Sequence, residues 1–536
     1  MKKILLTFAA LVAVVAVSAQ NVATVIIPRP METTAAKGAF VVTPKTVISV
    51  ADDSLVRPAE IFAGAVAAEE QMTLAVEKGA KKGIVLALDS ALGKEEYTLD
   101  VTSKGVSIKG GTPQGVFYGL QSLRQMLAAG VVTKKGVQIE AVSIKDKPLL
   151  GYRGAMLDVC RHFFTVKEVK QFIDMIAMHK MNVFHWHLTE DQGWRIEIKK
   201  YPNLVKKGSL RKQTVIGRWN SQSYDGMPYG GYYTQEEIRE VVKYAAERYI
   251  EIIPEIDMPG HMVAALASYN WLGCRDQKFE VRPTWGISED VLCVGKESTF
   301  TFIEDVLAEI FDLFPSKYIH LGGDEAPQVR WKECPHCQKR IQTEGLKDET
   351  ELQSYFTRRV EAILAKHDRK LVGWDEVIHG GVNKSVTLML WQDKNRQAVT
   401  SLGNDVILSP KLYCYTNYYQ TKRPYTNKEG DLHTRTAVTL RKAYSLNPYE
   451  NLTPEQCKNI KGVQCNLWTE FVKTFERVQT KMLPRMSAIA EVGWSQGEKD
   501  FDDFARRMQH MRKFYDMAGF HHYATYFFDG VDKSSR

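Results

Sequence analysis

The sequence has no long hydrophobic run and no concentration of charge of one sign. Its most apolar stretch, Ile4 to Val17, is too short for a helix that crosses a bilayer, which needs about 20 residues. Lys and Arg number 71 and Asp and Glu 63, a net charge of +8 over 536 residues, and the basic residues are spread along the chain. We therefore expect neither a membrane span nor a nucleic-acid partner.

The composition is that of a folded globular protein. Hydrophobic side chains make up 44%, charged side chains 25% and aromatic side chains 10% of the chain, which excludes disordered and fibrous classes. At roughly 100 to 200 residues per domain, the length favours a small domain and a large one. Nothing in the sequence indicates the oligomeric state.

The first residues resemble an export signal. Lys2 and Lys3 precede the apolar run, and Val17-Ser18-Ala19 supplies the small residues that a signal peptidase recognises. We predict a signal peptide over residues 1–19, with cleavage before Gln20. Because the residue at the expected cleavage point is Gln20 and not a cysteine, a lipid anchor is not expected, and the location predicted is periplasmic or secreted.

Eight cysteines are present, and export permits disulfides. Cys274 and Cys293 flank a loop-like segment rich in Gly, Arg and Asp, and we predict that they pair. Cys334-Pro-His-Cys337 has the spacing of half a zinc ribbon. Because no second C-x-x-C is present, a local bridge or free thiols are favoured over zinc, and no metal or cofactor is expected.

Residues 20–147 are predicted to form a small α+β domain. Short alternating runs at Gly83–Leu88, Tyr97–Val101 and Val106–Lys109 are typical of strands. A helix follows them, with Thr112 as its cap, Pro113 at its first position and leucines at helical spacing.

Residues 148–500 are predicted to form a (β/α)8 TIM barrel. Buried apolar runs alternate there with amphipathic stretches such as Val166–His179 and Glu236–Arg248, the pattern of β/α units. The eight predicted strands are Ala155–Val159, Val183–Leu188, Glu251–Ile256, Tyr318–Leu321, Leu371–Trp374, Thr387–Trp391, Asp405–Leu408 and Val463–Trp468. Residues 501–536 are predicted to be a C-terminal helix, which closes the last barrel unit, and a tail.

Polar and aromatic residues gather at the ends of these predicted strands, where a barrel places its active site. The strongest local signal is Gly322-Gly323-Asp324-Glu325, because glycines allow a sharp turn or a close approach before two carboxylates. Adjacent side chains diverge, so Asp324 and Glu325 are not expected to flank one anomeric carbon as paired glycosidase acids do. One of the two can be the acid while the other orients a neighbouring part of the substrate. If that part is a 2-acetamido group, its carbonyl oxygen can attack the anomeric carbon, so the enzyme needs no carboxylate nucleophile of its own.

Four ordered motifs make the chain similar to the family 20 glycoside hydrolases, the exo-acting β-N-acetylhexosaminidases. They are Arg153-Gly154-Ala155-Met156-Leu157-Asp158-Val159-Cys160-Arg161-His162-Phe163-Phe164, His185-Trp186-His187-Leu188-Thr189-Glu190-Asp191-Gln192-Gly193-Trp194-Arg195, Glu255-Ile256-Asp257-Met258-Pro259-Gly260-His261 and Gly322-Gly323-Asp324-Glu325. The resemblance covers roughly residues 25–500. It implies a glycan substrate with a terminal β-linked N-acetylhexosamine.

By this resemblance, Glu325 is the general acid and base, and Asp324 orients the acetamido nitrogen and stabilises an oxazolinium-like intermediate. Arg161 resembles the arginine that binds the 3- and 4-hydroxyls. The other implied sugar contacts are Trp374, Trp391 and Trp468 as pocket walls, Tyr415 on the acetamido carbonyl, and Glu470 with Asn417 near the 4- and 6-hydroxyls. His261, Glu190 and Asp191 resemble groups that tune Glu325.

Three positions depart from the commoner family pattern: Cys160, Glu190 and Asn417 stand where a small hydroxyl residue, Asp and Asp are frequent. None of them removes the catalytic pair. Asn417 leaves open the choice between gluco and galacto sugars.

Two other interpretations fit parts of the sequence. His185-x-His187 also resembles the metal ligands of barrel amidohydrolases, although the later strand ends carry mostly Trp, Tyr and Glu. A glycan-binding protein without activity would keep the aromatic pocket, but it would be expected to lose the acid pair, which is present.

Overall fold

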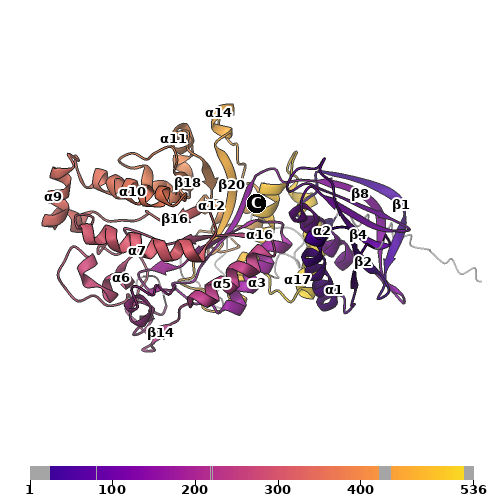
Figure 1. Cartoon of the computed structure of the whole chain (residues 1–536), viewed down its shortest axis with the longest axis horizontal. Coiled ribbons are helices and arrows are strands. Elements are labelled where there is room, and N and C mark those ends of the chain that lie inside the picture. The colour runs from indigo at the N-terminus through magenta and orange to yellow at the C-terminus, as the bar shows by residue number, and fades with distance from the viewer. Residues whose placement is uncertain (1–24, 80, 218, 220, 422–435, 524–536) are drawn as a thin grey trace, which may run out of the picture.

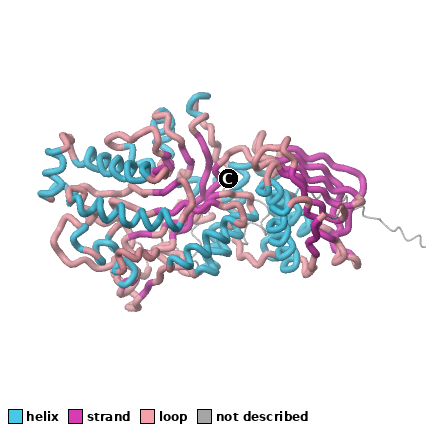
Figure 2. The backbone as a smooth tube through the Cα atoms, viewed as in Figure 1, coloured by secondary structure: helices cyan, strands magenta, loops and turns pink. Residues whose placement is uncertain are grey.

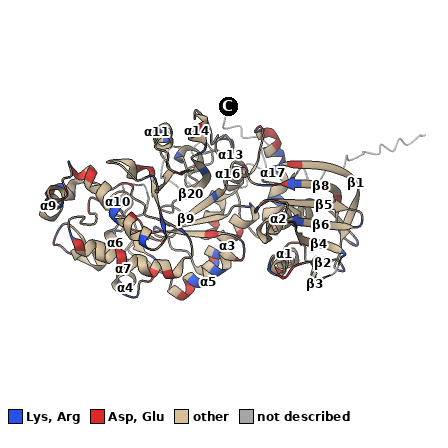
Figure 3. Ribbon diagram, turned by 45° about the horizontal axis from the view of Figure 1, so that its top comes forward, with Lys and Arg blue, Asp and Glu red and all other residues tan. Residues whose placement is uncertain are grey.

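The computed structural model describes residues 25–79, 81–217, 219, 221–421 and 436–523. The predicted signal peptide and most of the C-terminal tail lie outside these ranges. The described chain forms two units side by side, a sheet with helices and a barrel (Figure 1). Acidic and basic side chains are interspersed over both units (Figure 3). None of the described helices is long and apolar enough to cross a membrane.

The N-terminal unit is one mixed sheet covered by two helices on the side that faces the barrel (Figure 2). Its strands are β1 (Glu32–Val42), β2 (Val47–Val50), β3 (Ala75–Lys78), β4 (Gly83–Leu88), β5 (Tyr97–Thr102), β6 (Gly105–Gly110), β7 (Val131–Thr133) and β8 (Gly136–Asp146), and its helices are α1 (Val56–Glu69) and α2 (Pro113–Ala129). The strand order is β1-β8-β5-β6-β4-β2-β3, with β7 paired to β8. The predicted strands and α2 are present, whereas α1 was not predicted.

The second unit is a closed barrel of eight parallel strands, which confirms the predicted fold class. The strands are β9 (Tyr152–Asp158), β10 (Val183–His187), β15 (Glu251–Glu255), β16 (Tyr318–His320), β17 (Lys370–Trp374), β18 (Thr387–Leu390), β19 (Val406–Leu408) and β20 (Ile460–Leu467), and β20 closes the barrel on β9. Most strand positions are buried on both faces, as expected where helices cover a parallel sheet.

Helices connect the barrel strands. They include α3 (Val166–Met178), α5 (Gln235–Ala246), α6 (Val263–Ser268), α7 (Glu297–Leu313), α8 (Val329–Glu333), α9 (Pro335–Thr343), α10 (Glu349–Lys366), α11 (Arg396–Ser401), α12 (Lys411–Cys414), α13 (Leu440–Tyr444), α14 (Pro454–Cys457), α15 (Phe475–Met482) and α16 (Arg485–Trp494). Thr165 and Thr234 begin α3 and α5 with capping boxes, each pairing with the glutamate three residues on.

The C-terminal helix α17 (Phe501–Met517) joins the two units instead of only closing the barrel. It packs against α2, and Arg507 donates both to the carbonyl of Ile26 at 3.0 Å and to Glu491 of α16 at 2.7 Å. The prediction that this helix completes the last barrel unit therefore misses its contact with the N-terminal unit.

Candidate active site

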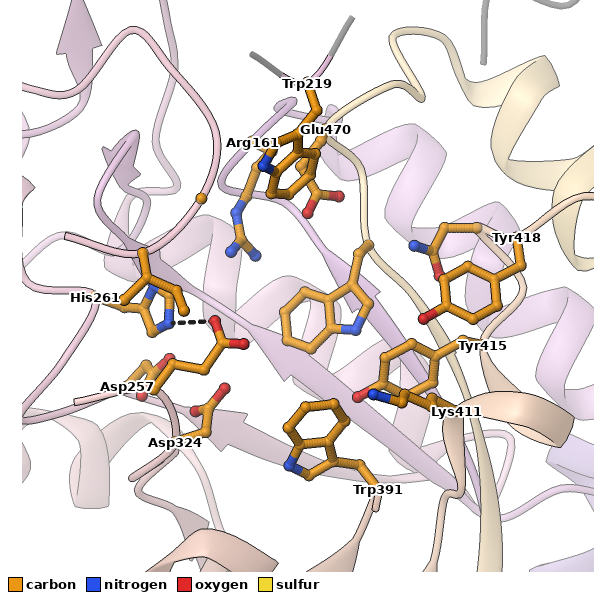
Figure 4. Close-up of a pocket in the computed structure, with 15 residues that line it drawn as sticks. Arg161, Trp219, Asp257, His261, Asp324, Trp391, Lys411, Tyr415, Tyr418 and Glu470 are labelled. Atoms are coloured by element: carbon orange, nitrogen blue, oxygen red, sulfur yellow. Dashed lines mark ion pairs between the residues drawn. The ribbon is translucent and has the colours of Figure 1, made fainter. Parts of the chain in front are cut away.

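The carboxyl ends of the barrel strands open into a cavity of about 400 Å³ (Figure 4). It is lined by Arg161, Trp219, Asp257, His261, Gly286, Ile287, Asp324, Glu325, Trp391, Lys411, Tyr415, Asn417, Tyr418, Trp468 and Glu470. Most of the sequence-predicted sugar contacts are among them, together with both predicted catalytic acids.

A strained turn presents the two acids. After β16 the chain passes through Gly322 and Gly323 with φ of +76° and +87°, and a Cβ on Gly322 would lie 1.8 Å from Oδ1 of Asp257. Only glycine therefore allows this approach. Glu325 itself has φ of +44°, rare for a residue with a side chain, and its N–H donates to Oε2 of Glu376 at 2.8 Å.

Glu325 ends an alternating chain of charges. Its Oε2 lies 3.5 Å from Nε2 of His261, and its side chain is 35% exposed. Nδ1 of His261 lies 2.7 Å from Oε1 of Glu190, and Nη2 of Arg161 lies 2.7 Å from the same oxygen. Burial opposes the charged imidazole, but Glu190 and Glu325 outweigh it and raise the pKa of His261 well above its ordinary value. His261, which faces Glu325, therefore favours its protonated form.

Glu190 and Asp191 have different contacts, although the sequence grouped them together. Glu190 contacts both His261 and Arg161. Asp191 lies 4.0 Å from His261 and instead accepts from the N–H of Val263 at 3.0 Å and from Arg282 at 3.1 Å. Of the two carboxylates, Glu190 is therefore the one that can act on Glu325 through His261. Asp191 instead stabilises the loop after β15.

Asp324 is half-buried on the cavity floor beside Asp257 (Figure 4). Its Oδ1 is itself buried and has no hydrogen-bond partner in the part of the chain that the structure describes. Burial raises the pKa of Asp324 well above its usual range, and the charges of Glu325 and Glu376 add to the effect. The pKa of Asp257 is raised in the same way, by burial and by the charge of Asp324. An oxygen of Asp324 is thus available for a donor that enters the cavity.

Aromatic rings form the opposite wall (Figure 4). Trp391 and Tyr415 are stacked with 6.3 Å between ring centroids, and Trp468 lies 6.3 Å from Tyr415. Trp374 was predicted to belong to this wall, but it is only 1% exposed and does not line the cavity. It packs beneath Trp391 and Trp468 in the barrel interior, so it supports the wall from below.

Arg161 and Glu470 lie together at one end of the cavity (Figure 4). Arg161 is fixed by ion pairs to Glu190 at 2.7 Å and Asp158 at 3.4 Å, and its guanidinium lies 5.0 Å from the ring centroid of Trp468. Oδ1 of Asn417 is buried and has no hydrogen-bond partner among the residues that the structure describes. The side chains of Arg161, Glu470 and Asn417 can therefore form hydrogen bonds with the hydroxyls of a sugar.

Several lining residues were not proposed as site residues from the sequence: Trp219, Asp257, Gly286, Ile287, Lys411 and Tyr418. Asp257 stands in a recognised strand-end motif, and Tyr418 directly follows Asn417, so neighbouring signals could have found both. Trp219, Gly286 and Ile287 lie in loops that are far in sequence from any barrel strand. The sequence around them carries no signal of a site.

The histidines that resemble amidohydrolase ligands lie beneath the cavity. His185 and His187 contact Oε2 of Glu255 at 2.9 and 2.5 Å, and His320 contacts Oε1 at 3.1 Å. Trp374 donates to the same Oε1 at 2.9 Å. None of these three imidazoles lines the cavity, so a metal held by them would not face a substrate there.

Acids and tryptophans that meet in one cavity at the strand ends of a barrel are the groups that glycoside cleavage uses. Residues 150–497 match glycosyl hydrolase family 20, catalytic domain, and residues 23–147 match domain 2 of the same family. The chain belongs to glycosyl hydrolase family 20, and the resemblance found in the motifs is confirmed.

Relatives and solved structures agree with this family. A β-hexosaminidase of Porphyromonas gingivalis is 43% identical over 516 residues, which are 93% of this chain but only 64% of that protein. The exo-β-N-acetylglucosaminidase of Vibrio harveyi, solved with N-acetylglucosamine, has a TM-score of 0.82 at 30% identity over 93% of this chain and 78% of that one. The β-N-acetylhexosaminidase of Bacteroides fragilis has a TM-score of 0.79 at 32% identity over 93% and 96%.

Proposed function

We propose that this protein is an exo-acting β-N-acetylhexosaminidase. It releases terminal N-acetylglucosamine or N-acetylgalactosamine from glycans by retaining hydrolysis, with the acetamido group of the substrate as nucleophile. The relatives named above support this activity, and a cavity of about 400 Å³ suits one terminal sugar, which favours exo action.

One observation carries the proposal: the half-buried Asp324 has a buried oxygen that lacks a partner among the described residues, and the partly exposed Glu325 follows it in sequence. An acetamido N–H would supply the missing donor. Fixing that nitrogen turns the carbonyl oxygen toward the anomeric carbon, and a carboxylate beside the nitrogen stabilises the positive charge that develops there. Glu325 at the cavity rim is then the group that reaches the glycosidic oxygen.

The reaction proceeds in two steps. The acetamido carbonyl oxygen bonds to the anomeric carbon while the proton of Glu325 passes to the departing glycosidic oxygen, whose bond to the sugar breaks. Glu325, now a carboxylate, removes a proton from water, and the water oxygen bonds to the anomeric carbon as the oxazolinium ring opens. Two inversions leave the β configuration.

The remaining contacts hold the sugar. Trp391, Tyr415 and Trp468 enclose the acetamido group and the sugar face, and the hydroxyl of Tyr415 supports the carbonyl. Arg161 forms hydrogen bonds with the 3- and 4-hydroxyls. Glu470 forms hydrogen bonds with the 4- and 6-hydroxyls, near Asn417. His261, paired to Glu190 at 2.7 Å, positions Glu325.

The test is release of nitrophenol from nitrophenyl β-N-acetylglucosaminide and from nitrophenyl β-glucoside, which lacks the acetamido group. We expect cleavage of the first alone, with the β-anomer as first product by NMR. Equal cleavage of both would show that a protein carboxylate is the nucleophile. Binding of the first without turnover would identify a glycan-binding protein instead.

Glu376→Gln is expected to shift the acidic limb of kcat/KM to lower pH. The active form needs ionised Asp324, whose proton is lost only above its raised pKa. The charge of Glu376 helps to raise that pKa, so removing the charge lowers it, while the amide of the variant keeps an oxygen for the N–H of Glu325, now 2.8 Å from Glu376. The matched control is Asp276→Asn, at an exposed acid. An unmoved limb in Glu376→Gln would show that the charge of Glu376 does not act on Asp324.

The N-terminal sequence supports a location for the enzyme. A signal peptide over residues 1–19, supported by Lys2, Lys3 and the small residues before Gln20, would place the enzyme in the periplasm or outside the cell. Mass spectrometry of the protein from its native host tests this, because cleavage leaves Gln20 as the first residue and an intact Met1 contradicts it.

A further inference from the structure

Four cysteines from two connections of the barrel, one after β15 and one after β16, meet at one point. The sulfurs of Cys274, Cys293, Cys334 and Cys337 all lie within 4.8 Å of one another. The disulfide predicted between Cys274 and Cys293 is not formed, and neither is a bridge between Cys334 and Cys337, because all four are free thiols. The sequence has no second C-x-x-C pair, but in the structure Cys274 and Cys293 lie beside Cys334 and Cys337.

The spacing of the sulfurs is that of a metal tetrahedron. Cys293 lies 3.6 Å from Cys334 and 3.7 Å from Cys337, and Cys274 lies 3.8 Å from Cys337. Four sulfurs at about 2.3 Å from a central Zn²⁺ are separated by about 3.8 Å. A disulfide would bring one pair to about 2.05 Å, whereas Cys293 is almost equally distant from two partners.

The surroundings hold the sulfurs in place. Cys293, Cys334 and Cys337 are at most 3% exposed, and Cys334 caps the N-terminus of α9, where negative charge is favoured. The N–H of Cys293 donates to Leu272 at 2.8 Å. A Cβ on Gly295 would lie 2.1 Å from the backbone of His336, so the two loops approach backbone to backbone.

We propose that Cys274, Cys293, Cys334 and Cys337 bind one Zn²⁺ as a structural tetrathiolate site. Four protein ligands complete the tetrahedron and leave no position for a substrate, so the ion acts on the fold and not on the reaction. Sulfur ligands in this geometry select Zn²⁺ or iron among common ions. No metal was expected from the sequence, because two of the ligands are not in a C-x-x-C pair.

The site joins the two loops that build one side of the active site. Cys274 and Cys293 bound the segment that carries Gly286 and Ile287 of the cavity. Cys334 lies between α8 and α9, in the connection after β16 that begins with Gly322, Gly323, Asp324 and Glu325. Other contacts cross the same junction: Arg330 pairs with Glu289 at 2.7 Å and with Asp290 at 3.2 Å. The ion would therefore fix one loop of the cavity against the other.

The first experiment measures metal in the purified full chain after dialysis against metal-free buffer without reductant. We expect one zinc per chain by plasma mass spectrometry, and release of that zinc when an organomercurial titrates the thiols. Alkylation after denaturation without reductant should then modify every cysteine. A metal-free protein with four cysteines protected from alkylation would overturn the proposal in favour of two disulfides, and iron with visible thiolate absorption would overturn zinc.

Variants locate the ion. Cys337→Ser is expected to lose zinc, whereas Cys457→Ser, at a half-buried cysteine outside the cluster, should keep one per chain. Zinc retained in Cys337→Ser would overturn the assignment of this ligand set. If Cys337→Ser does not fold, refolding of the wild-type chain with Co²⁺ provides the test, because four thiolates give intense charge-transfer absorption and its absence contradicts the site.

Discussion

Replacing Glu325 by Gln is expected to lower kcat on nitrophenyl β-N-acetylglucosaminide by about 10²- to 10⁴-fold, the usual contribution of a general acid. Gln has the same shape and cannot give a proton to the glycosidic oxygen. The hydrogen bond from the N–H of residue 325 to Glu376, at 2.8 Å, is a backbone contact and should remain. The strained backbone at this position should therefore stay in place.

The leaving group separates loss of the acid from loss of structure. A dinitrophenolate departs without protonation, so the first step of Glu325→Gln should be nearly normal with that substrate, seen as a burst of dinitrophenol. Glu333→Gln, at the end of α8 and 63% exposed at its side chain, is the matched control and should retain wild-type rates. An equal loss with both leaving groups would contradict the role of Glu325.

The barrel could be predicted because each of its strands is a short buried run followed by polar residues. Helix α1 was missed because it is rich in alanine, and alanine carries little of the apolar periodicity that marks a helix face. Trp374 shows a further limit, since a tryptophan at a strand end has the same sequence signal whether it lines a cavity or lies beneath one.

The cysteines show why contacts between loops are hard to predict. Cys274 and Cys293 are close in sequence, so a pairing between them followed from the local segment alone. Their position beside Cys334 and Cys337 depends on how the loops after β15 and β16 pack against each other. Likewise, α17 follows the barrel in sequence, but its contact with α2 depends on the arrangement of the two units.

Asp324→Asn is expected to lower kcat by about 10²- to 10³-fold, the effect of removing one preorganised group that stabilises transition-state charge. Asn keeps an oxygen that can accept the acetamido N–H, so the substitution removes chiefly the negative charge. Because that charge matters most when the oxazolinium forms, the loss should fall on kcat more than on KM. A loss confined to KM would show that Asp324 only binds the ground state.

The same substitution is expected to raise thermal stability at pH 7. Desolvation holds the folded-state pKa of Asp324 well above its ordinary value, so the ionised form of Asp324 destabilises the fold. That penalty is absent below the unfolded pKa of about 3.9 and grows as the pH rises toward the folded pKa. Calorimetry should therefore find a higher Tm for Asp324→Asn at pH 7 and little difference near pH 4, with Asp276→Asn unchanged at both. A lower Tm at pH 7 would mean that the carboxylate stabilises the fold, and the loss of activity could then not be attributed to its charge at the reacting centre.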